Sequence, residues 1–471
     1  MSENTTEAEK LKEELFMNNE HTAKVIDDAE MKEAFDFCES YKSFLNSCKT
    51  EREAAAFTVK EAEKRGFVPF DKNKHYAAGD KVYYLNRKKA VILAVIGKKS
   101  VGEGVRIAAA HIDSPRLDLK PNPLYEDTDI ALFKTHYYGG IKKYQWATIP
   151  MSLHGVVVKR DGSETQVNIG ENEGDPQFVI TDLLPHLAAS QMSRKPGEII
   201  KGEELNILVG SLPFKRDSGS ELVKLNIMKI LNEKYGIKEE DFLSAEIEVV
   251  PAGPSRDYGL DRSMVAGYGH DDRVCAYTSL RAILDIAQPE YTACCILVDK
   301  EEIGSVGATG AQSVFFENRI ADLLALQNET SYIALKKTME NCRMLSSDVS
   351  AGFDPLFPEV NDSKNAAYLN RGIVFNKYTG ARGKSGSNDA MPEYMAWIRK
   401  ICDDNNLYFQ TAELGKVDQG GGGTIAYILG NYNMNVIDAG ISVLNMHAPM
   451  EIVAKADVYE AYLVYKAFLL G

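Results

Sequence analysis

The stretch from Ile296 to Gly310, ILVDKEEIGSVGATG, constrains the fold of this chain more than any other. A run of apolar residues leads into Asp299-Lys300-Glu301-Glu302, which places adjacent carboxylates where a buried strand should end. Two glutamates at such a position must be exposed, share a proton or face a cation, because desolvated carboxylates repel each other and have raised pKa values. The rest of the sequence has to supply one of these environments.

Length and charge narrow the class of protein. At 471 residues the chain is long enough for two or three domains, or for one large domain that carries an insertion. The net charge of -14 argues against nucleic acid as a partner. There is no run of about 18 apolar residues, and the amino terminus is polar and acidic, so we expect neither a membrane span nor a signal peptide, and a cytoplasmic location.

The seven cysteines are odd in number, scattered and free of any Cys-x-x-Cys spacing. This pattern is typical of reduced, buried side chains, and it argues against a disulfide framework or a thiolate metal site. None of the cysteines lies in a glycine-rich catalytic turn, which also argues against a nucleophilic cysteine.

Hydrophobic periodicity predicts helices and strands of different character along the chain. Before residue 121 we expect two helices within 31–65, a hairpin over 81–96 and a strand over 105–110. From about Pro121 to Val250 short β-type runs alternate with turns around one helix, 222–235. After this block the predicted elements are a helix at 274–286, a strand at 331–335, a helix at 390–402, a helix opened by the glycine run 420–423, a strand at 435–438 and a helix at 454–470.

This change of pattern predicts an inserted domain. We expect a mixed-sheet α/β core formed by residues 1–122 and 252–471, with a β-rich domain, residues 123–251, between its two parts.

Two histidines stand just past apolar runs in short polar motifs, His111 in AAAHIDSP and His447 in LNMHAPME. One histidine in such a place is usually structural, but Asp113 is spaced to hold the ring of His111 in a single tautomer, as carboxylates do at metal sites. Carboxylates also occur where other elements end, in Asp271-Asp272, Glu301-Glu302 and Asp348. Two histidines with several carboxylates suit zinc, cobalt or manganese.

Five motifs, in this order, resemble the aspartyl-aminopeptidase and vacuolar-aminopeptidase family of dinuclear-metal exopeptidases: AAHIDSPRLDLKP, GHDDR, DKEEIGSVGATG, SSDVSAGFDP and NMHAPME. The resemblance covers nearly the whole chain, including an insertion of this size. It implies an α/β/α metallopeptidase core and a metallo-aminopeptidase that removes N-terminal amino acids from short peptides.

The resemblance also implies a ligand set for two divalent metal ions per subunit, with zinc as the first choice and cobalt or manganese as alternatives. One ion would be held by His111, Asp271 and Asp348. The other would be held by Asp271, Glu302 and His447, so that Asp271 bridges the pair. Two ions so placed would activate a shared water and polarise a carbonyl.

The remaining roles in the centre follow from the same resemblance. Glu301 would be the general base, and Asp113 would orient the first histidine ligand. Asp272 is an alternative bridging residue, but the family pattern favours the aspartate before it, and we expect an ion pair between Asp272 and Arg273. His270 is predicted to lie outside the site, because neighbouring side chains of an extended segment point in opposite directions.

Substrate recognition is less constrained by the sequence. An acid-preferring relative needs a basic group in its pocket, for which Lys377, Arg382 and Lys384 are the local candidates. Their segment departs from the aspartyl-type pattern, so preferences for acidic and for neutral or varied N-terminal residues both remain open. His186 matches a stretch that in the family reaches the active site of a neighbouring subunit. The glycines 420–423 lack the Lys-Ser/Thr of a phosphate-binding loop and fit either a backbone contact to the peptide or a flexible turn.

The resemblance further implies that the insertion drives homo-oligomerisation into a closed shell of twelve subunits, with a dimer as the simpler alternative. Peptides would then be the partners, with neither nucleic acid nor membrane involved. Two other functions fit the architecture, a metal-dependent N-acyl amino acid deacylase and a catalytically silent shell. The silent shell predicts the loss of a ligand or of the base, and all six residues are present.

Overall fold

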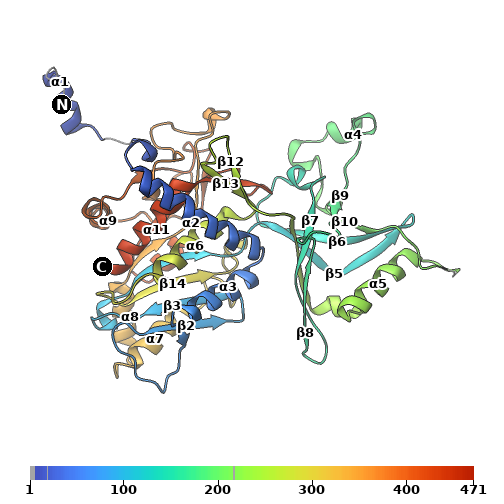
Figure 1. Cartoon of the computed structure of the whole chain (residues 1–471), viewed down its shortest axis with the longest axis horizontal. Coiled ribbons are helices and arrows are strands. Elements are labelled where there is room, and N and C mark those ends of the chain that lie inside the picture. The colour runs from blue at the N-terminus through green and yellow to red at the C-terminus, as the bar shows by residue number, and fades with distance from the viewer. Residues whose placement is uncertain (1–5, 18–19, 216–217) are drawn as a thin grey trace.

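The structure is a computed structural model that describes residues 6–17, 20–215 and 218–471. Within that part, the chain forms a large layered domain and a second domain built on a separate sheet, which stand side by side (Figure 1). We call the first the main domain. The second, Arg116–Pro251, is called the insert.

The main domain is centred on a mixed sheet of nine strands among the described residues. Its order is β1 (Val68–Pro69), β2 (Lys81–Asn86), β3 (Ala90–Val95), β14 (Ala293–Val298), β4 (Arg106–His111), β15 (Arg343–Ser346), β21 (Asn435–Gly440), β17 (Ile373–Asn376) and β19 (Phe409–Thr411). The four central strands β14, β4, β15 and β21 are parallel, and Val298 lies opposite His111. Their carboxyl ends therefore meet at one edge, where open α/β sheets bind ligands.

Helices cover both faces of this sheet. Alternate strand residues enter two different cores: Leu93 and Cys295 belong to one, and Ile92 and Ile296 belong to the other. The helices that contribute to the first core are α2 (Asp28–Ser47), α3 (Glu51–Lys64), α6 (His270–Leu284), α9 (Pro392–Asp404) and α11 (Lys455–Leu470). Those of the second core are α7 (Phe315–Ala325), α8 (Tyr332–Asn341) and α10 (Ala426–Gly430). The result is the predicted α/β/α core.

Two small sheets and several short helices complete the described part of the main domain. One sheet has the order β12 (Arg256–Tyr258), β13 (Met264–Gly267), β23 (Glu451–Ala454), β22 (Ser442–Leu444) and β16 (Ser350–Ala351), and the other pairs β18 (Gly380–Ala381) with β20 (Gly421–Gly422). The short helices are α1 (Glu7–Leu15), η1 (Thr22–Lys24), η2 (Val101–Glu103), η8 (Glu301–Ile303) and η9 (Pro358–Val360).

The insert is an antiparallel sheet with its own core. Its described strands have the order β8 (Glu164–Ile169), β7 (Met151–Val158), β11 (Ala245–Pro251), β5 (Arg116–Asp127), β6 (Ile130–Tyr138), β10 (Ile207–Gly210) and β9 (Val179–Ile180). The helix α5 (Leu222–Tyr235) packs against β5, β6 and β10. The short helices are η3 (Lys143–Trp146), η4 (Pro185–Leu187), α4 (Ala189–Met192), η5 (Pro196–Glu198), η6 (Gly202–Glu204) and η7 (Glu239–Ser244). Because β5 begins at Arg116, it carries the chain from the His111 motif directly into the insert.

Most predicted elements match the structure to within a few residues, including the amino-terminal helices, the hairpin and the carboxyl-terminal helix. The strand predicted at 331–335 is wrong, since the helix α8 begins at Tyr332. The side chain of Ser331 accepts the amide of Ala334 and caps this helix, and Tyr332 and Ile333 are 71% and 68% exposed. A helix cap therefore outweighs the strand propensity of a short apolar run.

The cysteines and the helices bear on two further expectations. All seven cysteines are buried and unpaired, as predicted from their spacing. Among the described residues, none of the helices combines the length and the apolar character needed to cross a bilayer.

Candidate metal centre

The site lies at the carboxyl edge of the central parallel strands. His111 is the last residue of β4, η8 with its two glutamates follows β14, and Asp348 follows β15. Asp271 enters from the first turn of α6, and His447 enters from the loop between β22 and β23. Five separate segments thus converge on one place.

Two groups of potential ligands share one carboxylate. The Nε2 atom of His111 lies 3.2 Å from Oδ1 of Asp271, and the Nε2 atom of His447 lies 3.1 Å from Oδ2 of the same residue. Ligand atoms lie within 4.8 Å of one another in both groups, which are His111, Asp271 and Asp348, and Asp271, Glu302 and His447. One oxygen of Asp271 is directed toward each histidine, as a bridging carboxylate requires.

Hydrogen bonds fix both imidazole rings. Nδ1 of His111 is 2.9 Å from the carbonyl oxygen of Asp113, and Nδ1 of His447 is 2.7 Å from the carbonyl oxygen of Gly140. A carbonyl only accepts, so in both rings Nδ1 carries the proton. Nε2 of each ring is therefore directed toward the shared carboxylate, and it is the nitrogen that would bind a metal.

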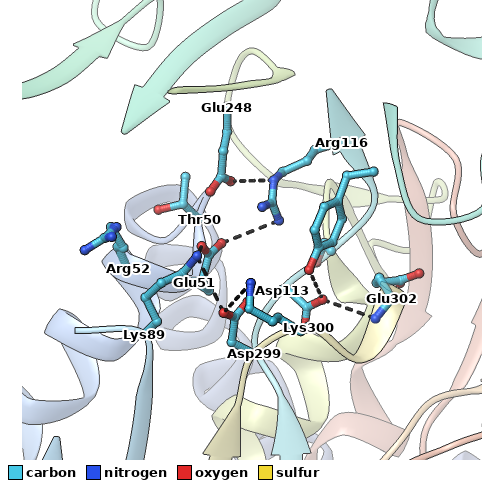
Figure 2. Close-up of polar contacts among 12 residues, drawn as sticks. Thr50, Glu51, Arg52, Lys89, Asp113, Arg116, Glu248, Asp299, Lys300 and Glu302 are labelled. Atoms are coloured by element: carbon cyan, nitrogen blue, oxygen red, sulfur yellow. Dashed lines mark hydrogen bonds and ion pairs between the residues drawn. The ribbon is translucent and has the colours of Figure 1, made fainter. Parts of the chain in front are cut away.

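Asp113 does more than hold a histidine. Its Oδ1 lies 3.3 Å from Nδ1 of His111 and accepts the backbone amide of Glu301 at 3.1 Å. Its Oδ2 accepts the amide of Glu302 at 3.2 Å (Figure 2). The same oxygen accepts the hydroxyl of Tyr138 at 2.8 Å. The sequence suggested only the contact with His111. Nothing in the spacing shows that Asp113 lies beneath the turn Lys300–Glu302, which we call the glutamate turn.

The electrostatics of the site favour bound cations. Burial, followed by the charge of Asp271, raises the pKa of Glu302 well above its ordinary value, and burial likewise raises the pKa of Asp348. Burial raises the pKa of Glu301 to about 7. The Oε1 atom of Glu302 is buried without a hydrogen-bond partner. Crowded, desolvated carboxylates with an unsatisfied oxygen fit a pair of divalent ions, because ions would provide the missing positive charge.

The residues beside Asp271 have structural contacts. One oxygen of Asp272 accepts the backbone amide at the end of β4, 3.3 Å away. The expected ion pair with Arg273 is wrong, because the guanidinium turns away and donates to the carbonyl of Lys49 at 2.8 Å. His270 contacts the hydroxyl of Tyr41 at 2.6 Å, and burial lowers its pKa to about 3. The contacts of His270, Asp272 and Arg273 depend on what surrounds each buried side chain, which their order in the sequence does not show.

The two ligand groups face a cavity of about 450 Å³. Beyond the metal-site residues, its wall is formed by the segments that carry Asn376, Thr379, Leu414 and Tyr427 and by the glycines 421–423. Thr424 donates a hydrogen bond to Asp438 at 2.6 Å on the same wall. Among the described residues that line the cavity there is no lysine and no arginine.

The candidate substrate residues lie elsewhere. The ammonium group of Lys377 is 3.3 Å from Asp389, which also pairs with Lys384 at 2.9 Å. Arg382 and Lys384 line a separate, smaller cavity. His186 is exposed on η4 of the insert and does not line the cavity at the ligand groups. Within one chain, then, neither Lys377 nor His186 joins the centre.

A shared carboxylate between two histidines, at the strand ends of an α/β/α core, defines a metal-dependent hydrolase. The chain belongs to the M18 family: residues 44–469 match the family model described as aminopeptidase I zinc metalloprotease (M18). It is 57% identical over 447 residues to the probable M18 family aminopeptidase 1 of Clostridium acetobutylicum, covering 94% of this chain and 96% of that protein. The protein is therefore an aminopeptidase of a zinc metalloprotease family, and the predicted family and enzyme class are confirmed.

Solved structures support the same fold. The crystal structure of aminopeptidase I from Clostridium acetobutylicum matches with a TM-score of 0.91 at 52% identity, covering 97% of this chain and 100% of that chain. The crystal structure of the M18 aminopeptidase from Thermotoga maritima matches with a TM-score of 0.92 at 44% identity, covering 96% and 99%. The predicted fold class is confirmed by both.

Proposed function

We propose that this zinc aminopeptidase removes N-terminal residues from short peptides at a two-ion centre. The observation that carries the proposal is the position of Asp271, whose two carboxylate oxygens each lie close to a different histidine. His111 and Asp348 would complete the site of one ion, and Glu302 and His447 that of the other. Zinc is proposed for both positions, since the family is a zinc family and imidazole with carboxylate suits this ion.

Glu301 is proposed as the general base. Two bound ions would polarise the scissile carbonyl and supply a nucleophile at neutral pH. Glu301 is not among the ligands proposed for either ion, although its carboxylate lies within 4.8 Å of ligand atoms of His111 and Glu302, and it lines the same cavity. It is thus placed to take a proton from the attacking water and to deliver it to the leaving amine. Asp113 fixes the turn that carries both glutamates.

The cavity supports a preference for neutral N-terminal residues. An acidic side chain would need a cation in the pocket, and the described lining offers none. Lys377 stays a predicted substrate contact, but it would have to leave Asp389 to meet a substrate carboxylate. A second cavity of about 890 Å³ shares Leu414 and His447 with the first and offers room for the rest of the peptide.

We also propose that the insert, for which the sequence predicted the bounds 123–251, is an oligomerisation domain. Apolar side chains around His186 are exposed in the single chain: Leu183 50%, Leu184 50%, Leu187 66% and Met192 68%. Contact with another subunit would remove this surface from water. A homo-oligomer, with the dodecamer as the specific expectation, would bring His186 to a neighbouring active site. Light scattering gives the mass, and a monomer would contradict this part of the proposal.

The test of the reaction is a panel of amino-acyl anilides with matched N-acetyl amino acids. We expect the zinc-loaded enzyme to cleave leucyl and alanyl anilides, and to cleave aspartyl anilide at least about tenfold more slowly, the cost of a pocket without a cation. N-acetyl-leucine should remain intact. Hydrolysis of N-acetyl-leucine but not of the anilides would instead identify a deacylase, and no turnover of either would identify a silent shell.

A further inference from the structure

The end of β6 in the insert reaches the metal centre through three successive residues, Tyr138–Gly140. The carbonyl of Gly140 accepts the Nδ1 proton of His447 at 2.7 Å. Gly139 has a φ of +75°, and a Cβ at this position would lie 3.0 Å from Oε2 of Glu302. The insert therefore comes so close to Glu302 that only a glycine fits without a shift.

The first of these residues, Tyr138, donates its hydroxyl to Oδ2 of Asp113 at 2.8 Å. The ring is 8% exposed. On one face it is covered by the guanidinium of Arg116, whose central carbon is 3.8 Å from the ring centre. A stacked cation and a buried hydroxyl contact leave the tyrosine little freedom to move.

Arg116 is itself held from several directions. Its Nε lies 2.8 Å from Asp118. The same Nε lies 3.2 Å from Glu248, and a terminal nitrogen lies 3.5 Å from Glu51 (Figure 2). The first two partners belong to strands of the insert, and Glu51 begins α3 of the main domain. A planar guanidinium that bonds in its plane and stacks on its face is a rigid support for Tyr138.

The same network reaches the glutamate turn from its other end. Lys89 lies 2.7 Å from Glu51, 3.0 Å from Glu246 and 3.5 Å from Asp299, the residue that precedes the turn Lys300–Glu302. The side chains of Lys89, Glu51 and Asp299 are at most 9% exposed. Breaking one buried ion pair of this network is costly, because it leaves an uncompensated charge in the interior.

From these contacts we infer that Tyr138 is a positioning residue for the metal centre. Through Tyr138 the insert, besides forming its own domain, holds the glutamate turn Lys300–Glu302 in place. The carboxylate of Asp113 accepts three hydrogen bonds, two from the amides of Glu301 and Glu302 and one from the hydroxyl of Tyr138, and it lies 3.3 Å from Nδ1 of His111. The hydroxyl of Tyr138 is the only one of these contacts that comes from the insert. It fixes the carboxylate plane, and so the orientation of the turn.

The inference rests on the proposed role of Glu301. A base that takes a proton in the transition state must be positioned within a fraction of an ångström. If the carboxylate of Asp113 moves more freely, Glu301 is held less firmly, and the chemical step should slow more than peptide binding weakens. The peptide cavity itself has no contribution from Tyr138. The effect is therefore expected in kcat and not in KM.

Tyr138→Phe tests the inference, since it keeps the ring over Arg116 and removes only the hydroxyl. We expect kcat to fall about tenfold, the scale of a lost hydrogen bond to a charged group, while KM stays within about twofold. Zinc content by elemental analysis should be unchanged. Hydrogen exchange followed by mass spectrometry should become faster in the peptide 299–306, which carries the Glu301 and Glu302 amides.

The matched control is Tyr462→Phe. Tyr462 of α11 also donates its hydroxyl to a carboxylate, that of Asp285 at 3.0 Å, but Asp285 caps the carboxyl end of α6, opposite to the end that carries Asp271. It should leave kcat and exchange at 299–306 unchanged. Arg116→Lys, which keeps the charge and loses the flat face over the ring, should change kcat and exchange in the same direction as Tyr138→Phe.

The outcomes separate this inference from the proposed function. Unchanged kcat and unchanged hydrogen exchange in Tyr138→Phe would overturn the inference. A loss of zinc, or a fall in thermal stability beyond that of Tyr462→Phe, would also overturn it, because either result would indicate a purely structural role for Tyr138. If Glu301→Gln stays fully active while exchange still accelerates in Tyr138→Phe, the base assignment fails and the contact through Asp113 stands.

Discussion

Nδ1 of His447 lies 2.7 Å from the carbonyl oxygen of Gly140, a residue of the insert that precedes it by 307 positions. This bond directs Nε2 of the histidine toward Asp271. The metal centre is therefore built jointly by two domains, and its geometry depends on how the insert is seated.

Replacing Glu301 by glutamine should abolish most turnover without loss of metal. The amide keeps the size of the side chain but cannot accept the proton, and loss of a positioned base typically costs about a hundred- to ten-thousand-fold in kcat. Steady-state kinetics on leucyl anilide and zinc analysis check this together. The control is Glu329→Gln, an exposed glutamate remote from the site. Activity near that of the wild type would refute the assignment of the base.

Replacing Asp271 by alanine should remove both ions, because each ligand group contains this residue. Elemental analysis of the purified variant should find less than about a tenth of the wild-type zinc, as expected when a charged ligand is lost from each site. One ion retained per chain would contradict the bridging role.

The neighbouring aspartate provides the comparison. Burial raises the pKa of Asp272 well above its ordinary value, so the neutral side chain of Asp272→Asn is a close substitute. This variant should retain both ions. Loss of zinc in Asp272→Asn, with retention in Asp271→Ala, would transfer the bridging role to residue 272.

Gly440→Ala should damage the centre from a distance. Gly440 ends β21, and a Cβ there would overlap the backbone carbonyl of Asp348. Relieving such overlap costs about 1–3 kcal/mol, and here the loop that moves carries a proposed ligand. We expect weaker zinc binding, measured by competition with a chelator. Gly197→Ala is the control, since its Cβ would have no neighbour within 4 Å, and equal zinc affinity in both variants would contradict the prediction.

Removal of metal should destabilise the folded enzyme. Without cations the buried carboxyls of Glu302 and Asp348 either repel or take up protons. Chelation should therefore abolish peptidase activity and lower the thermal midpoint, and zinc should restore both, with a stabilisation that grows with the logarithm of its concentration. Asp271→Ala should show no such response. Recovery with cobalt or manganese would identify which ions the centre accepts.

A buried histidine between the domains should make stability depend on pH. His154 of β7 lies 2.8 Å from Glu53 of α3 and 3.2 Å from Glu171, near Lys49. Although burial disfavours the charged ring, its bonds with Glu171 and Glu53 raise the pKa of His154. A raised pKa means that folding favours the protonated ring, so the stabilisation is complete below about pH 6.5 and is lost as the pH rises through the folded-state pKa.

The measurement is the thermal midpoint of the wild type and of His154→Gln across this pH range. The variant should be the less stable at pH 6, and the difference should shrink at alkaline pH. His136→Gln, at an exposed position on β6 of the same sheet, should show no such trend. A difference that grows with pH would contradict the sign of the shift.

Much of the fold follows from local patterns. The strands β3 and β14 are buried along their whole length, and the sequence shows this as continuous apolar runs. The helices of the main domain show as periodic apolar positions. The error at 331–335 arose where a short apolar segment is exposed and a serine cap decides the structure. The ion pair expected between Asp272 and Arg273 failed because adjacent side chains of a helix start point to different surroundings.

The sequence by itself indicated which residues meet at this edge of the sheet, first as charged motifs and then through the ligand set that the family resemblance implies. Carboxylates and histidines directly after buried strands are easy to recognise in the sequence. A charged group at such a position is costly unless it is paired or binds a cation. The tertiary structure alone decided how they are held: that Asp113 carries the amides of the glutamate turn, that Lys377 pairs with Asp389, and that Tyr138 and Gly140 of the insert support the centre. These contacts join residues far apart in the chain, and only packing brings them within hydrogen-bond distance.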